Sequence, residues 1–226
     1  MKEWIFKGDS REILRYLGVS KNSGEDMLPL IEDIKEETRN ILRFRWVYNI
    51  YSIVQESKGV ILKDVEILLK GQHIKSHLKN SSKCVVLAAT LGSEIDRRIN
   101  YYQKCDMLKA LIVNACATAF IEEGCNYVES LIKEEFCSDY EELTWRYSPG
   151  YGDLSLDVQG ELLKLLQGNK DIGLYLSESN MLIPKKSVTA IVGIIPKGKS
   201  SNKKSCENCL NKNNCNYRKT GESCEN

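Results

Sequence analysis

The residues best suited to chemistry lie in one stretch, Arg146-Tyr147-Ser148-Pro149-Gly150-Tyr151-Gly152-Asp153. Its arginine can hold a carboxylate through two parallel N–H···O bonds, a geometry that the compact ammonium of lysine does not reproduce. Its Pro-Gly pair forms a turn, and its two glycines let a ligand approach bare backbone. Its two tyrosines offer ring faces for a flat base. The stretch therefore predicts a site for a small zwitterion with a flat ring, with an ordinary solvated loop as the alternative.

The overall composition gives no bulk charge to drive binding. The chain of 226 residues holds 32 lysines and arginines against 31 acidic residues, so we expect no nucleic-acid partner. The N-terminus lacks the apolar core of a signal peptide, and no apolar run reaches the roughly 18 residues that a membrane span needs. We therefore expect a cytoplasmic protein without a membrane partner. Nine cysteines, an odd number, then indicate free thiols or metal ligands instead of disulfides.

The first half of the chain predicts a helix, three strands and the start of a second helix. Residues 26–44 carry apolar side chains at three- and four-residue intervals, which predicts an amphipathic helix. Residues 46–54 and 59–69 are rich in aromatic and β-branched side chains, which predicts two strands. Residues 83–92 are almost wholly apolar and end in glycine, as expected of a strand covered on both faces. A helix should open directly after that glycine.

The second half predicts a long helix, the Arg146 turn, a shorter helix and a last strand. Residues 106–136 repeat apolar side chains at helical spacing and form the longest predicted element. Ser155 or Asp157 can cap the shorter helix, which Gly168 should end. Residues 187–195 predict the last strand. We expect a domain over residues 1–196, followed by a linker and cysteine-rich tail over residues 197–226.

Two sequence blocks carry a family resemblance. The first is Arg-x-x-Pro-Gly-Tyr at residues 146–151, and the second is Leu-Ser-Glu-Ser-Asn-Met-Leu-Ile-Pro-x-x-Ser-Val at residues 176–188. With the helix between them, they resemble the activation (reactivation) domain of cobalamin-dependent methionine synthase. The resemblance covers most of residues 1–196 and stops before the tail. It implies an α+β fold with a bent antiparallel sheet, packing helices and one long central helix.

The resemblance also implies an S-adenosylmethionine site. Arg146 would hold the methionine carboxylate of this ligand. The backbone at Ser148 and Gly150 would contact its nucleoside, and Tyr151 is the aromatic neighbour in the motif.

Two positions depart from the pattern of the full synthases. A glutamate that lies near the amino group of the ligand aligns with Thr118, and Glu122, one turn further along the long helix, is the expected substitute. A tyrosine after the last strand has no counterpart in residues 194–197.

The implied function is reductive methylation, or reactivation, of cob(II)alamin on a separate methionine synthase. The chain would be a stand-alone methyltransferase component, with cobalamin carried by the partner and an electron donor such as flavodoxin or ferredoxin. The sequence shows no catalytic acid–base signature, as expected when the methyl donor is already activated and needs only to be positioned. The alternatives are a non-catalytic metal-binding partner or sensor of a corrinoid protein, and a reactivator of a corrinoid methyltransferase outside methionine synthesis.

Four tail cysteines form a candidate metal site: Cys206, Cys209, Cys215 and Cys224. The first two are separated by two residues, which lets both sulfurs face one ion. Four thiolates suit either a zinc ion or an iron–sulfur cluster. The alternative is a polar tail with incidental cysteines.

Two other groups of residues are interpreted as structural. His73 and His77 stand four apart, but Ile74 holds the place where a zinc protease has glutamate. We therefore expect exposed helical histidines. The remaining cysteines show no ligand spacing and are interpreted as small core or surface residues: Cys84, Cys105, Cys116, Cys125 and Cys137.

Overall fold

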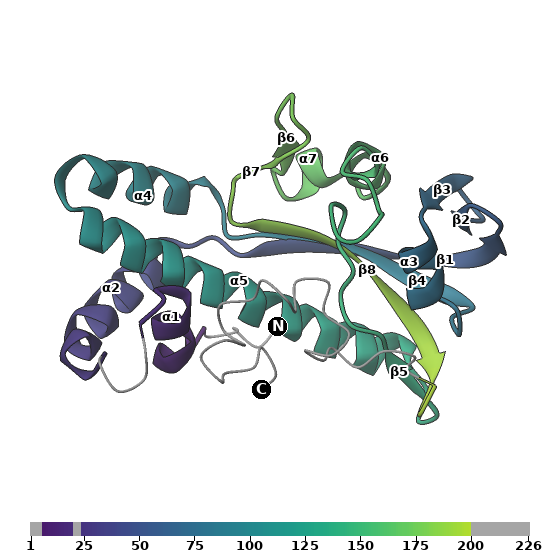
Figure 1. The fold of residues 1–226 in the computed structure, drawn as a ribbon, viewed down its shortest axis with the longest axis horizontal. Helices are drawn as coiled ribbons and strands as arrows, with labels where there is room; N and C mark the ends of the chain where they lie inside the picture. Colours follow the sequence, from purple (N-terminus) through teal and green to yellow (C-terminus); the bar gives the residue numbers. More distant parts are fainter. Residues whose placement is uncertain (1–5, 20–23, 200–226) are drawn as a thin grey trace. The chain divides into compact units, whose positions relative to one another are not determined.

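The computed structural model describes residues 6–19 and 24–199 (Figure 1). The helices are α1 (Ser10–Tyr16), the short 3-10 helix η1 (Glu25–Met27), α2 (Leu28–Ile41), α3 (Gln72–His77), α4 (Ser93–Cys105), α5 (Met107–Phe136), α6 (Val158–Leu165) and α7 (Gly168–Asp171). The strands are β1 (Arg45–Glu56), β2 (Gly59–Leu62), β3 (Ile67–Lys70), β4 (Lys83–Thr90), β5 (Glu141–Leu143), β6 (Tyr175–Leu176), β7 (Leu182–Ile183) and β8 (Ser187–Pro196).

Six of the strands form one antiparallel sheet in the order β3-β2-β1-β4-β8-β5. β6 and β7 form a separate two-stranded sheet. The sheet, the helices packed with it and the 30-residue α5 confirm the expected α+β fold with one long helix. The chain divides into two compact units, and β1, β4, β8, α5 and α6 each continue from one unit into the other.

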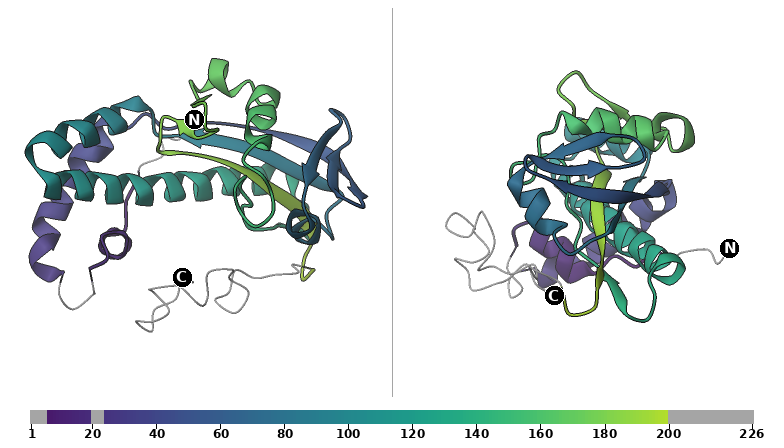
Figure 2. Two further views of the ribbon diagram at one scale, coloured as in Figure 1. Left: turned by 45° about the horizontal axis from the view of Figure 1, so that its top comes forward. Right: turned by 90° about the vertical axis from the view of Figure 1, so that its right-hand side faces the viewer.

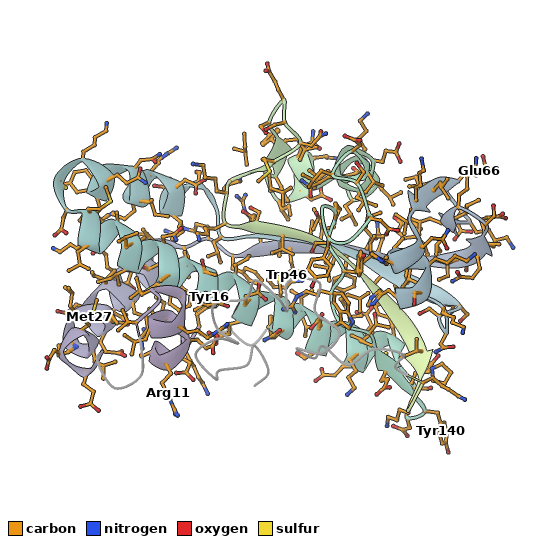
Figure 3. The ribbon with its side chains drawn as sticks, viewed as in Figure 1. Arg11, Tyr16, Met27, Trp46, Glu66 and Tyr140 are labelled. Atoms are coloured by element: carbon orange, nitrogen blue, oxygen red, sulfur yellow. The ribbon has the colours of Figure 1, made fainter. Side chains whose placement is uncertain are left out.

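Within the described residues, the first unit comprises residues 6–19 and 24–48, Ala88–Ile132 and Leu162–Thr189. Its core forms where α1 and α2 pack with the apolar side chains of α5. Phe120 of α5 is fully buried, and its ring meets that of Phe6 edge to face at 5.7 Å. Phe44 extends this aromatic group to Trp46, which is labelled in Figure 3.

Within the described residues, the second unit comprises Asn49–Leu87, Lys133–Glu161 and residues 190–199. It contains the β2–β3 hairpin, drawn in blue in Figure 2, and α3, which follows this hairpin directly. Glu66, labelled in Figure 3, adopts a left-handed φ of 55° at the hairpin turn. β5 and the Arg146 segment also lie in this unit.

Most of the predicted regular elements are confirmed, with two corrections. The single strand expected over residues 59–69 is a hairpin of β2 and β3, because Lys63, Asp64 and the left-handed Glu66 turn the chain back. Gly168 does not end α6. That helix ends at Leu165, Gln167 adopts a left-handed φ of 50°, and Gly168 begins α7.

Besides α7, five short elements were not predicted: α1, η1, β5, β6 and β7. Within the described residues, no helix is both long and apolar enough to cross a membrane.

Candidate functional site

The Arg146 segment, residues 144–153, continues from β5, the outermost strand of the main sheet, and contains a bulge. β5 pairs with β8 in regular register. The Thr144 amide continues this register by donating to the Gly193 carbonyl at 2.9 Å, but Tyr147 exchanges two backbone bonds with Ile191, at 2.9 and 2.8 Å. The chain therefore advances three residues, from Thr144 to Tyr147, while β8 advances only two, from Gly193 to Ile191. The extra residue falls beside Arg146, where a bulge can re-aim a side chain.

The ring of His77 packs against this bulge. Thr144 Oγ1 lies 3.0 Å from His77 Nε2. The ring centroids of Trp145 and Tyr147 lie 4.5 and 5.1 Å from that of His77. Regular alternation would send neighbouring side chains to opposite faces, so the three contacts agree with an interrupted strand.

His77 was predicted to be exposed, and that prediction is wrong. Its exposed fraction is 6%, whereas His73, on the same helix, is exposed as expected. Burial lowers the pKa of His77 to about 4, against the opposing effect of a backbone hydrogen bond with Trp145. The ring is therefore neutral at pH 7 and packs as part of the core.

The turn of residues 148–154 is closed by its own backbone hydrogen bonds. The Tyr151 amide donates to the Ser148 carbonyl at 3.1 Å, and the Leu154 amide donates to the Tyr151 carbonyl at 3.1 Å. The Gly150 amide donates to the Leu154 carbonyl at 2.8 Å. Because this bond occupies the Gly150 N–H, a ligand at this turn would meet the carbonyl and Cα of Gly150.

Asp153 fastens the end of this turn to α3. One of its carboxylate oxygens accepts from the Gln72 amide at 2.6 Å, and the other accepts from the His73 amide at 3.1 Å. The preceding residue, Gly71, provides no capping side chain. Asp153 therefore caps α3 from 81 residues away in the sequence.

The two tyrosines of the segment differ in exposure. Tyr147 was predicted to offer a ring face to a ligand, but it is 3% exposed, so this prediction is wrong. Burial raises its pKa to about 12, with smaller contributions from Asp153 and Tyr151. Tyr151 is 45% exposed and meets the rings of Trp145 and Tyr147 edge to face at 5.7 and 5.5 Å. Tyr151 is thus the tyrosine with a ring face open to solvent.

A groove of about 720 Å³ lies beside the turn in the second unit. The predicted ligand contacts do not line it, although Asp153 does. Its wall on the hairpin side carries two lysines, and the wall leading into α6 carries three carboxylates. The lining residues are Lys58, Leu68, Lys70, Gly71, Gln72, Asp153, Leu154, Ser155, Asp157, Val158 and Glu161.

The two predicted positions on α5 lie in the first unit. Thr118 Oγ1 donates to the Asn114 carbonyl at 2.9 Å and accepts from Lys186 Nζ at 2.7 Å. Burial lowers the pKa of Lys186 to about 8, and the negative charge of Asp96 opposes this shift. Glu122 is half-buried one turn further along α5. The hydroxyl at position 118 is therefore already engaged by a cation.

The candidate metal ligands Cys206, Cys209, Cys215 and Cys224 lie outside the described residues. Within residues 6–19 and 24–199, no group of three or more metal-binding side chains is arranged to hold an ion. The prediction of a metal site in the tail stays a prediction. None of the five cysteines among the described residues forms a disulfide: Cys84, Cys116 and Cys125 are buried, Cys137 is half-buried and Cys105 is exposed.

Comparisons with known proteins identify the fold. A scan against protein-family models finds no match, and a search of curated proteins finds no similar sequence. Among solved structures, the chain is similar to the MetH reactivation domain bound to AdoHcy, with a TM-score of 0.63 and 16% sequence identity. The alignment covers 97% of this chain and 79% of that chain. At this identity the likeness shows a shared fold, and that fold is the one the sequence motifs implied.

The residues that hold the segment in place were not found from the sequence. Asp153 was noticed only as the end of the motif, and His77 was interpreted as exposed. The partners of Asp153 and Thr144 lie about 50 to 80 positions away. Gly71 followed directly by a short polar helix was the one local signal, because such a helix lacks a cap of its own.

Proposed function

We propose that this chain binds S-adenosylmethionine at the turn of residues 146–151 and supports reductive methylation of cob(II)alamin on a cobalamin-binding partner. The observation that carries the proposal is the place of the Arg-x-x-Pro-Gly-Tyr motif. It forms a hydrogen-bonded, partly exposed turn next to a bulged edge strand, on a fold shared with the MetH reactivation domain bound to AdoHcy.

The turn offers a suitable group for each part of this ligand. The Arg146 guanidinium would pair with the carboxylate, and its planar fork allows a two-bond contact. The backbone carbonyls of Ser148 and Gly150 would accept hydrogen bonds from the amino group of the adenine base or from the ribose hydroxyls. The exposed ring of Tyr151 would pack against the flat base.

The amino group of the ligand requires a different contact from that of the full synthases. Lys186 donates to Thr118, so position 118 presents a neighbouring cation and is unsuited to an ammonium group. We propose Glu122, one turn along α5, as the carboxylate that pairs with this group.

The proposed role of the chain is positioning. Bound S-adenosylmethionine supplies an activated methyl group, and cobalamin on the partner receives it together with one electron from a separate donor. The chain itself would hold the carboxylate and the nucleoside so that the sulfonium methyl faces the partner. Because no proton is transferred, no general acid or base is required.

The binding step is tested by calorimetry with S-adenosylmethionine and with adenosine, which lacks the carboxylate. We expect Arg146→Ala to weaken S-adenosylmethionine binding by roughly 10- to 100-fold, since a hydrogen bond to a charged group contributes about 1.5–3 kcal/mol. Arg146→Lys should recover only part of the loss. Adenosine binding should be unchanged in Arg146→Ala.

The control is Arg97→Ala, which removes a 73% exposed arginine side chain from α4. This variant should bind both ligands normally. Absence of binding to the wild-type protein at millimolar S-adenosylmethionine would overturn the proposal, as would equal losses for both ligands in Arg146→Ala.

The methylation step needs an anaerobic mixture of this chain, a cobalamin-loaded methionine synthase core, a reductant and S-adenosylmethionine. We expect the absorption spectrum of methylcobalamin to appear with the wild type and not with Arg146→Ala. If ligand binding occurs but methylcobalamin does not form with this or another corrinoid protein, the non-catalytic partner role is favoured. Iron, sulfide and zinc analysis of anaerobically purified protein tests the tail separately.

A further inference from the structure

We infer that Asp153 is a positioning residue, which keeps the 148–152 turn in its binding shape by clamping it to the first turn of α3. The inference rests on the proposed function, because the turn would hold S-adenosylmethionine. Asp153 itself is given no contact with the ligand.

The clamp is a two-oxygen contact. The Asp153 carboxylate accepts the Gln72 amide at 2.6 Å with one oxygen and the His73 amide at 3.1 Å with the other. A charged acceptor on backbone N–H groups forms stronger bonds than a neutral one, and the first turn of a helix adds a favourable dipole. The contact joins two segments of the second unit that are 81 residues apart in the sequence.

The turn and α3 approach each other so closely that a side chain at either of two glycines would collide with neighbouring atoms. A Cβ on Gly71, whose φ is 149°, would lie 2.4 Å from Asp153 Oδ1. A Cβ on Gly152, whose φ is 57°, would lie 2.3 Å from the Tyr147 hydroxyl and 2.7 Å from His73 Nδ1. Both glycines are therefore needed for the turn and α3 to approach this closely.

The turn is held at its other end by the sheet. Tyr147 exchanges two backbone hydrogen bonds with Ile191, directly before the turn begins. Asp153 lies directly before Leu154, whose carbonyl accepts from the Gly150 amide at 2.8 Å. With both ends fixed, the backbone between them is preorganised, which lowers the ordering cost of binding a ligand. Release of Asp153 should free one end and weaken binding.

The test compares Asp153→Ala and Asp153→Asn with a matched control, Asp157→Ala. The Asp157 carboxylate lies four residues further on, lines the same groove and accepts from Ser155 Oγ at 2.8 Å. All three variants remove one negative charge, but only the first two alter the clamp: Asp153→Ala removes both acceptor oxygens and Asp153→Asn removes one. The affinity for S-adenosylmethionine is measured by calorimetry at a temperature where every variant is fully folded.

We expect the dissociation constant to rise about tenfold in Asp153→Ala, less in Asp153→Asn, which retains one acceptor oxygen, and not at all in Asp157→Ala. A purely structural cap would lower the melting temperature without changing the affinity of the folded protein. Unchanged affinity in Asp153→Ala would therefore overturn the inference.

A second substitution disturbs the same contact from the α3 side. Gly71→Ala places a methyl group against the Asp153 carboxylate. The double variant combines Gly71→Ala with Asp153→Ala. If both residues act through one clamp, its affinity for S-adenosylmethionine should be no lower than that of whichever single variant binds more weakly. Additive losses would show that Asp153 does not act through α3.

A ligand-free measurement separates failure of this inference from failure of the proposed function. Hydrogen exchange at the Gly150 and Leu154 amides should be faster in Asp153→Ala than in the wild type, and unchanged in Asp157→Ala. If the wild type binds no S-adenosylmethionine but this exchange pattern is found, the proposed function is refuted and the inference about Asp153 as a clamp is supported. If exchange at these amides does not change in Asp153→Ala, the inference about the clamp is refuted, whether or not S-adenosylmethionine binds.

Discussion

Acidification should destabilise the fold through His77. The ring is 6% exposed and lies among Thr144, Trp145 and Tyr147. Burial lowers its pKa to about 4 in the folded state, whereas an unfolded histidine titrates near 6.5. Between these two values the unfolded chain binds the extra proton, so stability falls as the pH falls.

The size of the effect follows from the two pKa values. A gap of about 2.5 pH units corresponds to roughly 3 kcal/mol of unfolding free energy. This contribution is fully present above about pH 6.5 and is lost as the pH falls to about 4. Such a loss is a large part of the roughly 5–15 kcal/mol that stabilises a typical domain.

The assay is urea unfolding of the wild type and His77→Gln at a series of pH values from 7.5 to 4. Carboxylates that titrate in the same range are common to both proteins, so the difference between them isolates the histidine. The wild type should lose roughly 3 kcal/mol relative to His77→Gln over this range. The control is Ile74→Val, which shortens a fully buried side chain on the same helix. It should lower the unfolding free energy by about 1 kcal/mol at every pH. A difference between wild type and His77→Gln that does not change with pH would refute the reasoning.

Three further outcomes follow from burial in the first unit. Phe120→Ala should lower the unfolding free energy by about 3–5 kcal/mol in denaturant titrations, since the ring is fully buried against Phe6. Peptide mapping after brief alkylation of the native protein should find Cys105 modified and Cys116 protected, because Cys105 is exposed and burial raises the pKa of the Cys116 thiol to about 12. In ¹³C-methylated protein, one lysine signal should titrate near pH 8, as burial lowers the pKa of Lys186, and should be missing in Lys186→Gln.

The sequence predicted the long elements because their patterns are local. The apolar spacing of α5 and the unbroken apolar run of β4 are properties of neighbouring residues, and both elements formed close to their predicted bounds. The prediction of one strand over residues 59–69 was wrong because the composition favours a strand throughout, whereas the left-handed Glu66 turns the chain back.

The turn of the candidate site was predicted for the same reason, whereas its role in ligand binding stays a prediction. The sequence placed Arg146 beside a turn, and the turn is present. It did not show that Tyr147 is buried or that a bulge interrupts the strand, because both depend on pairing with Ile191, more than forty residues later. Long-range contacts of this kind leave no local pattern.

The bulge also bears on whether this edge of the sheet can pair with another chain. The Arg146 segment continues from β5, an outer strand of the six-stranded sheet, and a long, regular edge strand invites pairing with another chain. Here regular pairing stops at Thr144 and Pro149 follows soon after the Tyr147 bridge. A proline has no N–H to donate and a bulge disturbs the ladder of free backbone groups. The irregular backbone proposed to hold the ligand would thus also protect this edge from aggregation.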